Sequence, residues 1–148
     1  MRILKFIAVM ITPLAFMACS TVNKASKSKT DPVIDKIQII ESGEIDSSTD
    51  PYIVQSLKIQ DSILEIEVCF GGCAEHDWKL VTSRRYKKSL PPQLDIYLIH
   101  DQHDDPCKRQ DCQTLYFDIS DAKYPGKTED YTITLNLSKS NKSVNYDY

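Results

Sequence analysis

Apolar and polar residues alternate with a period of two through most of the chain between residues 33 and 137. The clearest segment is 63–70, where Leu64, Ile66, Val68 and Phe70 share one face, as in a half-buried β-strand. The same alternation predicts strands in four later segments, 76–82, 94–100, 114–120 and 131–137. Two earlier segments, 33–40 and 52–60, also indicate strands, although their alternation is less regular.

No segment has the 3.6-residue period of an amphipathic helix. Six or seven short strands with polar connections predict an all-β fold, namely an antiparallel β-sandwich, Ig-like or a small barrel. The connections fit this fold, with a tight turn expected at 60–62 and a longer glycine-containing turn at 70–75. We therefore expect one β-sandwich domain over residues 33–138, followed by a polar tail over 139–148.

The first eighteen residues have the pattern of a secretory signal peptide. Arg2 and Lys5 precede an apolar run over 6–17, which is shorter than the roughly 20 residues that cross a bilayer. Ala18 and Cys19 follow, and this order resembles the lipobox of bacterial lipoproteins, although Phe16 stands where that family usually has leucine.

The lipoprotein resemblance implies that residues 1–18 are removed and that Cys19 is lipidated, which would anchor the chain in a membrane. The alternative is an ordinary cleaved signal with an incidental cysteine. Ser20 resembles the outer-membrane sorting case, so we expect an outer-membrane lipoprotein whose domain lies in the periplasm. Residues 19–32 would then be the lipidated cysteine and a flexible tether, because they are rich in Ser and Lys.

The net charge of the chain bears on which classes of partner it can bind. Residues 1–18 carry two basic and no acidic residues, so 16 basic and 21 acidic residues remain after cleavage, a net charge of −5. An acidic domain is a poor candidate for binding nucleic acid. A short basic segment at 83–88, SRRYKK, is a solvated strand end or a docking site for an acidic envelope partner.

Four cysteines remain in the domain, and an even number in an exported protein indicates two disulfides. Pairing loop residue with loop residue and strand-edge residue with strand-edge residue favours Cys73 with Cys107 and Cys69 with Cys112. Local pairing, 69 with 73 and 107 with 112, is the second alternative. Sequence alone does not decide the connectivity.

Two histidines are expected to meet. His76 and His100 share the phase of the inward residues of their strands, so they converge on one interior face if these strands are neighbours. Imidazole, carboxylate and thiolate are ligands of zinc and copper. The candidate metal ligands are His76, His100, Glu75 and Asp105, or the two histidines with Cys73 and Cys107.

The structural interpretation explains the same residues without a metal. A buried histidine donates its ring N–H to a carboxylate or carbonyl, aspartates cap turns, and disulfide-bonded cysteines do not ligate. For catalysis, we find no Gly-x-Ser-x-Gly, His-Glu-x-x-His or phosphate-binding glycine loop. We therefore expect no catalytic residue and no cofactor, with zinc or copper as the alternative.

Four short motifs, GGCAEH (71–76), LIHD (98–101), DDPC (104–107) and LYFDIS (115–120), resemble a group of small uncharacterised bacterial envelope lipoproteins. The resemblance covers residues 67–120 and implies that Cys73 acts with Cys107 and that His76 lies with His100. It brings no established activity. The sequence thus favours a lipid-anchored binding or structural module of the envelope without catalysis, the alternative being a metal-binding lipoprotein.

Overall fold

The computed structural model describes residues 32–41 and 43–148, and these residues form nine strands and no α-helix. No helix in this part of the chain has the length and apolar character needed to span a membrane. The strands are β1 (Ile34–Lys36), β2 (Gln38–Ile39), β3 (Tyr52–Gln60), β4 (Ile63–Gly71), β5 (Asp77–Thr82), β6 (Gln93–Asp101), β7 (Gln110–Asp118), β8 (Thr132–Leu137) and β9 (Lys142–Asp147), with a 3-10 turn η1 (Ser120–Ala122).

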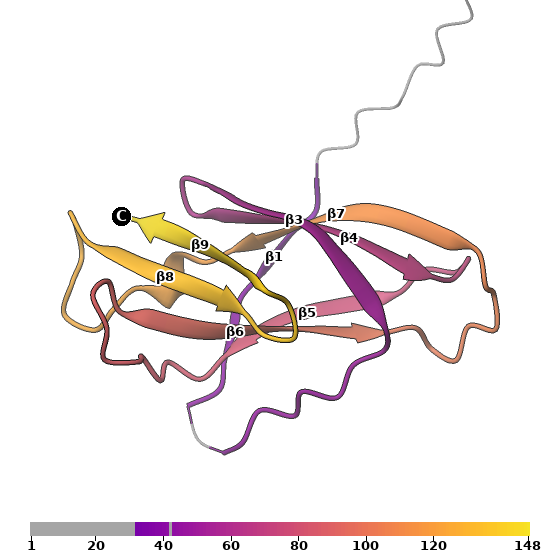
Figure 1. Ribbon diagram of the computed structural model, residues 1–148, viewed down its shortest axis with the longest axis horizontal. Helices are drawn as coiled ribbons and strands as arrows, with labels where there is room; N and C mark the ends of the chain where they lie inside the picture. Colours follow the sequence, from indigo (N-terminus) through magenta and orange to yellow (C-terminus); the bar gives the residue numbers. More distant parts are fainter. Residues whose placement is uncertain (1–31, 42) are drawn as a thin grey trace, which may run out of the picture. The chain divides into compact units, whose positions relative to one another are not determined.

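The strands form two sheets, which Figure 1 shows as two layers. One sheet has the order β1-β7-β4-β3 and the other the order β2-β5-β6-β8-β9. The predicted all-β class is confirmed, but both sheets are mixed, because β1 runs parallel to β7, β2 to β5, and β6 to β8. The prediction of an antiparallel sandwich with six or seven strands is therefore confirmed only in part. Four strand pairs are antiparallel, but three are parallel, and the described residues form nine strands.

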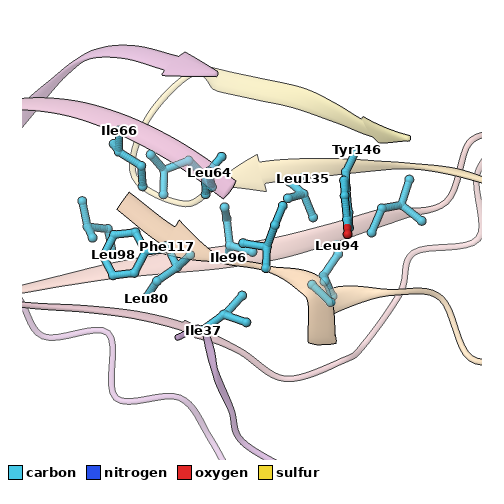
Figure 2. Close-up of a cluster of buried hydrophobic side chains, with 14 of the residues drawn as sticks. Ile37, Leu64, Ile66, Leu80, Leu94, Ile96, Leu98, Phe117, Leu135 and Tyr146 are labelled. Carbon is cyan, nitrogen blue, oxygen red and sulfur yellow. The ribbon is translucent and has the colours of Figure 1, made fainter. Parts of the chain in front are cut away.

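The core lies between the two sheets and consists of the residues that the alternation placed inward. Figure 2 shows side chains from β4, β6, β7 and β8 meeting in this layer. Those that are completely or almost completely buried include Leu64, Ile66, Leu94, Ile96, Phe117, Ile133 and Leu135. Each fully buried Leu or Ile contributes about 1.5–3 kcal/mol relative to an exposed side chain, so this layer is the main source of stability.

The segment 33–40 forms two strands rather than the single predicted one. β1 pairs with β7 in one sheet and β2 pairs with β5 in the other, so the chain crosses between the sheets at Ile37. The Ile37 side chain is buried in the core, and its amide donates to the carbonyl of Asp118 at 3.0 Å. The crossing explains why this segment alternates less regularly than the others.

A β-bulge explains the irregular alternation of β3. The pairing of β3 with β4 shifts between Val54 and Ser56, which leaves Gln55 without a partner residue. Tyr52 and Val54 pack against the core before the bulge, and Leu57 and Ile59 do so after it. One extra residue therefore changes the inward positions from even to odd numbers.

The end of the chain is not the expected polar tail. Residues 142–147 form β9, which pairs with β8 along its whole length. Tyr146 is completely buried, and its hydroxyl lies 3.0 Å from that of Ser62. The domain boundary predicted at residue 138 is therefore wrong, because Val144 and Tyr146 give this polar segment an inward face.

Beside the second half of β6 lies a segment that is not a regular strand. β8 pairs with β6 only as far as Ile96, and the segment that precedes β3 continues along β6 beyond that point. Asp50 donates its amide to the carbonyl of His100 at 3.0 Å, and His100 donates its amide to the Thr49 hydroxyl at 2.8 Å. The Tyr52 hydroxyl donates to the Leu98 carbonyl at 2.8 Å. These bonds fix the part of β6 that carries His100.

Candidate functional site

The structure brings the two histidines together. His76 immediately precedes β5, His100 is near the end of β6, and the antiparallel pairing places Trp78 opposite His100. His76 Nδ1 lies 2.8 Å from His100 Nε2, and both residues are buried. One of these nitrogens donates and the other accepts, so the two facing nitrogens share a single proton. The predicted convergence on one interior face is confirmed.

Asp105 completes this group, which we call the histidine cluster (His76, His100 and Asp105). Its Oδ2 lies 3.5 Å from His76 Nε2 and accepts the amide hydrogens of Cys73 at 2.6 Å and Ala74 at 2.9 Å. Its Oδ1 accepts the amide hydrogen of Cys107 at 2.9 Å. The bond from Cys73, followed by those from Ala74 and Cys107, holds the pKa of Asp105 well below its usual range. The carboxylate is therefore ionised and joins the β4–β5 turn to the β6–β7 loop.

Aromatic rings enclose the histidines. The rings of Trp78 and His100 stack with centroids 4.0 Å apart and an interplanar angle of 9°. The ring of Phe70 lies 4.7 Å from that of His76 and 5.4 Å from that of His100. Burial lowers the pKa of His100, because a charged imidazolium would lose its hydration here. The ring of His100 is therefore neutral at pH 7.

Two ring nitrogens at this site have no hydrogen-bond partner within the described chain. They are His100 Nδ1 and Trp78 Nε1, and both atoms are buried. Both atoms belong to the stacked pair of rings. The two histidines were predicted at this site from the sequence. Their aromatic partner Phe70 was not, although its inward phase on β4 indicated it.

Gly72 makes room for the imidazole of His76. A Cβ at residue 72 would lie 2.3 Å from His76 Cε1 and 2.4 Å from Nε2, closer than any side chain tolerates. At the adjacent Gly71, a Cβ would have nothing within 4 Å. The first glycine is therefore replaceable on steric grounds, whereas the second is required by the packing of His76.

Both disulfides have the pairing that the sequence favoured, Cys69 with Cys112 and Cys73 with Cys107. Cys69 and Cys112 face each other across β4 and β7, with Cα atoms 4.1 Å apart. Cys73 and Cys107 join the β4–β5 turn to the β6–β7 loop, with Cα atoms 5.7 Å apart. The second disulfide therefore links the same two segments as Asp105. The four sulfurs are in covalent bonds, so the ligand set with Cys73 and Cys107 is excluded in this state.

The carboxylate ligand set is only partly assembled. His76, His100 and Asp105 lie together, but the Glu75 side chain is exposed and makes no hydrogen bond to them. Within residues 32–41 and 43–148, no group of three or more His, Cys, Asp or Glu side chains is placed to hold a metal ion. The facing nitrogens of the histidines bond each other, so a shared metal would first have to break that bond. Zinc or copper therefore does not fit this arrangement.

A second set of polar side chains lies at the surface beside the cluster. His103 Nε2 is 3.2 Å from Asp77 Oδ2, and His103 Nδ1 is 3.5 Å from Asp101 Oδ1. All three side chains are more than half exposed. Exposed pairs of this kind contribute little to stability. The predicted lipidation site, Cys19, lies outside the described residues.

The comparisons with known proteins inform the fold. No protein-family model and no curated protein matches the chain. A NigD-like immunity protein from Bacteroides caccae is similar in structure, with a TM-score of 0.57 and 12% identity over 77% of this chain. A protein of unknown function, DUF1344, from Bacteroides vulgatus has a TM-score of 0.52 and 12% identity over 79% of this chain.

The chain spans 59% and 57% of the lengths of these two proteins. A putative toxin-related protein from Parabacteroides distasonis has 21% identity and a TM-score of 0.47. At these identities the likeness concerns the fold alone. What the histidine cluster does must therefore be inferred from its own geometry.

Proposed function

We propose that the protein is a binding module of the cell envelope, held at the outer membrane by a lipid on Cys19, that acts through contact with another envelope protein and has no catalysis of its own. The observation that carries this proposal is that the polar groups of the histidine cluster bond to other groups of the same chain. Its groups bond one another and the backbone of two loops, and its rings are covered by Phe70 and Trp78. These side chains serve to fix a binding scaffold.

Export is supported by the signal-like pattern of residues 1–18 and by the two disulfides, since disulfides persist in oxidising compartments. The fold is also used by a protein named as an immunity protein, a name that does not refer to catalysis. A scaffold with rigid loops suits binding, because a pre-organised surface loses less entropy when a partner docks.

Metabolic labelling with a radioactive fatty acid, followed by fractionation of inner and outer membranes, tests the anchor. The wild-type chain should carry label and sediment with the outer membrane. A Cys19→Ala variant should carry none, yet should retain both disulfides, as shown by mass spectrometry with alkylation before and after reduction. An unlabelled wild-type chain in the soluble fraction would contradict the lipid anchor.

Photo-crosslinking in intact cells tests the binding role. A photoreactive residue is placed at exposed positions around the domain, and a specific partner should crosslink from one face and not from the others. The absence of any position-dependent crosslink would count against a binding module. A turnover that disappears in a folded His76→Gln variant would replace the proposal with an enzymatic one.

A further inference from the structure

A groove lies at the end of the domain opposite the histidine cluster. It is formed by the β5–β6 loop (83–92) and the β7–β8 connection (119–131), which Figure 1 shows at the same end as the C-terminus. Its volume is about 530 Å³. We call it the tyrosine–lysine groove, and its lining residues are Tyr86, Lys87, Lys88, Ser89, Leu90, Pro92, Tyr124 and Tyr131.

The wall of the groove is held by tyrosine hydroxyls. The Tyr86 hydroxyl lies 3.0 Å from the Ala122 carbonyl and 2.9 Å from that of Lys123, so it joins the two loops. The Tyr124 amide donates to the Tyr148 hydroxyl at 2.7 Å. Burial raises the pKa of Tyr86 to about 12, so its hydroxyl keeps the proton that it donates. The groove is therefore a built feature and not a gap between mobile loops.

The charged side chains that line the groove are both lysines. Lys87 and Lys88 line the groove, and no acidic side chain does so. Lys88 is exposed and makes no ion pair or hydrogen bond within the described chain, while Lys87 is paired with Asp95 at 2.8 Å. Lys127 Nζ stands over the Tyr131 ring, 5.3 Å from its centroid. Lys127, like the acidic Glu129 and Asp130 of the same connection, lies beside the groove and does not line it. On a chain of net negative charge, this is a local cationic surface.

An apolar side chain stands beside these charges. Leu90 is 97% exposed, the most exposed large apolar side chain of the described domain. Aromatic side chains surrounded by a polar, solvent-accessible rim are the composition of a protein–protein interface. A sugar-stacking site would present open ring faces, whereas Lys127 lies over the ring of Tyr131 and the rings of Tyr86 and Tyr124 pack edge to face with centroids 4.9 Å apart.

We propose that the tyrosine–lysine groove is the docking site for an acidic segment of a partner protein that also presents an apolar side chain to Leu90. The inference rests on the proposed binding function and assigns it to one surface. Lysines steer an acidic segment towards the groove, and Leu90 with the tyrosine walls provides the apolar contact.

The test uses a synthetic peptide rich in glutamate with two central leucines, and the same peptide with every glutamate replaced by glutamine. Binding to the domain is followed by amide chemical shifts. The acidic peptide should shift residues 86–92 and 123–131, and the glutamine peptide should not. Raising the salt concentration from about 0.05 M to about 0.3 M should weaken binding, because it shortens the screening length.

Charge-reversal variants provide the matched control. Lys88→Glu with Lys127→Glu should weaken binding about tenfold, because like charges then oppose each other. Lys58→Glu with Lys108→Glu makes the same change in net charge at exposed lysines outside the β5–β6 loop and the β7–β8 connection, and it should leave binding unchanged. Leu90→Ser should weaken binding about fivefold without altering its salt dependence, since it removes only apolar contact.

Several results would overturn the assignment. Equal binding of both peptides, equal weakening by the control pair, or shifts outside the groove would each do so. Binding of phosphatidylglycerol vesicles through the same lysines, without binding of the peptide, would assign the surface to a membrane. A partner that crosslinks in cells from a position outside the groove, and not from Leu90, would also overturn it while leaving the binding function in place.

Discussion

The two ends of this β-sandwich join their loops in different ways. At one end, the β4–β5 turn and the β6–β7 loop are linked by the Cys73–Cys107 disulfide, by Asp105 and by the buried histidine pair. At the other end, two loops meet through the Tyr86 hydroxyl and leave a groove of about 530 Å³. The closed end contains the residues that resemble an active site, and the open end contains those that resemble an interface. The residues at the closed end bond one another and the backbone of two loops, whereas the groove at the open end is lined mainly by side chains open to solvent.

Of the changes at the closed end, removing the Cys73–Cys107 disulfide should lower the unfolding free energy most. The Cys73→Ala/Cys107→Ala variant should lose about 4 kcal/mol of unfolding free energy, because a loop with a sequence separation of 34 is no longer closed in the unfolded chain. Urea denaturation under oxidising conditions measures this loss. A loss below about 1 kcal/mol would mean that the hydrogen bonds alone hold the end together.

The second disulfide is the matched control for that experiment. The Cys69→Ala/Cys112→Ala variant opens a loop of similar size, with a separation of 43, and should lose a similar free energy. Hydrogen exchange separates the two variants. Only loss of the Cys73–Cys107 disulfide should speed exchange at the amides of residues 74 and 107, whose hydrogens bond to the Asp105 carboxylate.

Gly72→Ala should have the next largest effect. The new methyl group would lie 2.3 Å from His76 Cε1, so the imidazole or the turn must move, at a cost of about 2 kcal/mol in unfolding free energy. Gly71→Ala is the control, since its methyl group meets nothing within 4 Å, and it should change stability by less than about 0.5 kcal/mol. Equal losses in the two variants would show that the histidine packing does not restrict residue 72.

A change at the open end should be smaller. Tyr86→Phe removes the hydroxyl that bonds the Ala122 and Lys123 carbonyls and should reduce the unfolding free energy by about 1 kcal/mol. Tyr97→Phe is the control, because Tyr97 is partly exposed and its hydroxyl makes no hydrogen bond within the described chain. A loss at Tyr86 larger than that of Gly72→Ala would reverse the ranking of the two ends.

The unfolding free energy should not depend on pH near pH 7.5, and it should become pH-dependent on acidification. Burial lowers the pKa of His100 in the folded state, so below about 6.5 the unfolded chain binds the proton first. The unfolding free energy should therefore fall as the pH drops from 7 towards 5. His100→Phe should show a smaller fall over this range in urea denaturation at several pH values. An unchanged slope in this variant would contradict the assignment to His100.

The sequence allowed much of the closed end to be predicted. Strict alternation placed His76 and His100 inward, and their strands proved to be neighbours. Cys73 and Cys107 lie in turns, which favoured their pairing. The role of Asp105 as acceptor of three backbone amides could not be predicted, because it depends on how two loops meet in space.

Strand directions and the last strand were harder to predict. The alternation within a segment does not encode whether its neighbour is parallel, so the three parallel pairs were missed. β9 has only Val144 and Tyr146 as apolar residues, and its inward face exists because β8 lies beside it. The tyrosine–lysine groove also depends on tertiary packing, although its basic segment is visible in the sequence.

The stacking of Trp78 on His100 has a practical consequence. Trp78 is the only tryptophan of the chain, so its fluorescence comes from the closed end alone. The emission of an indole ring is sensitive to a charge that appears next to it, and the protonation of His100 would place one in direct contact. The protein therefore carries an intrinsic optical reporter of its histidine cluster, readable without any attached dye.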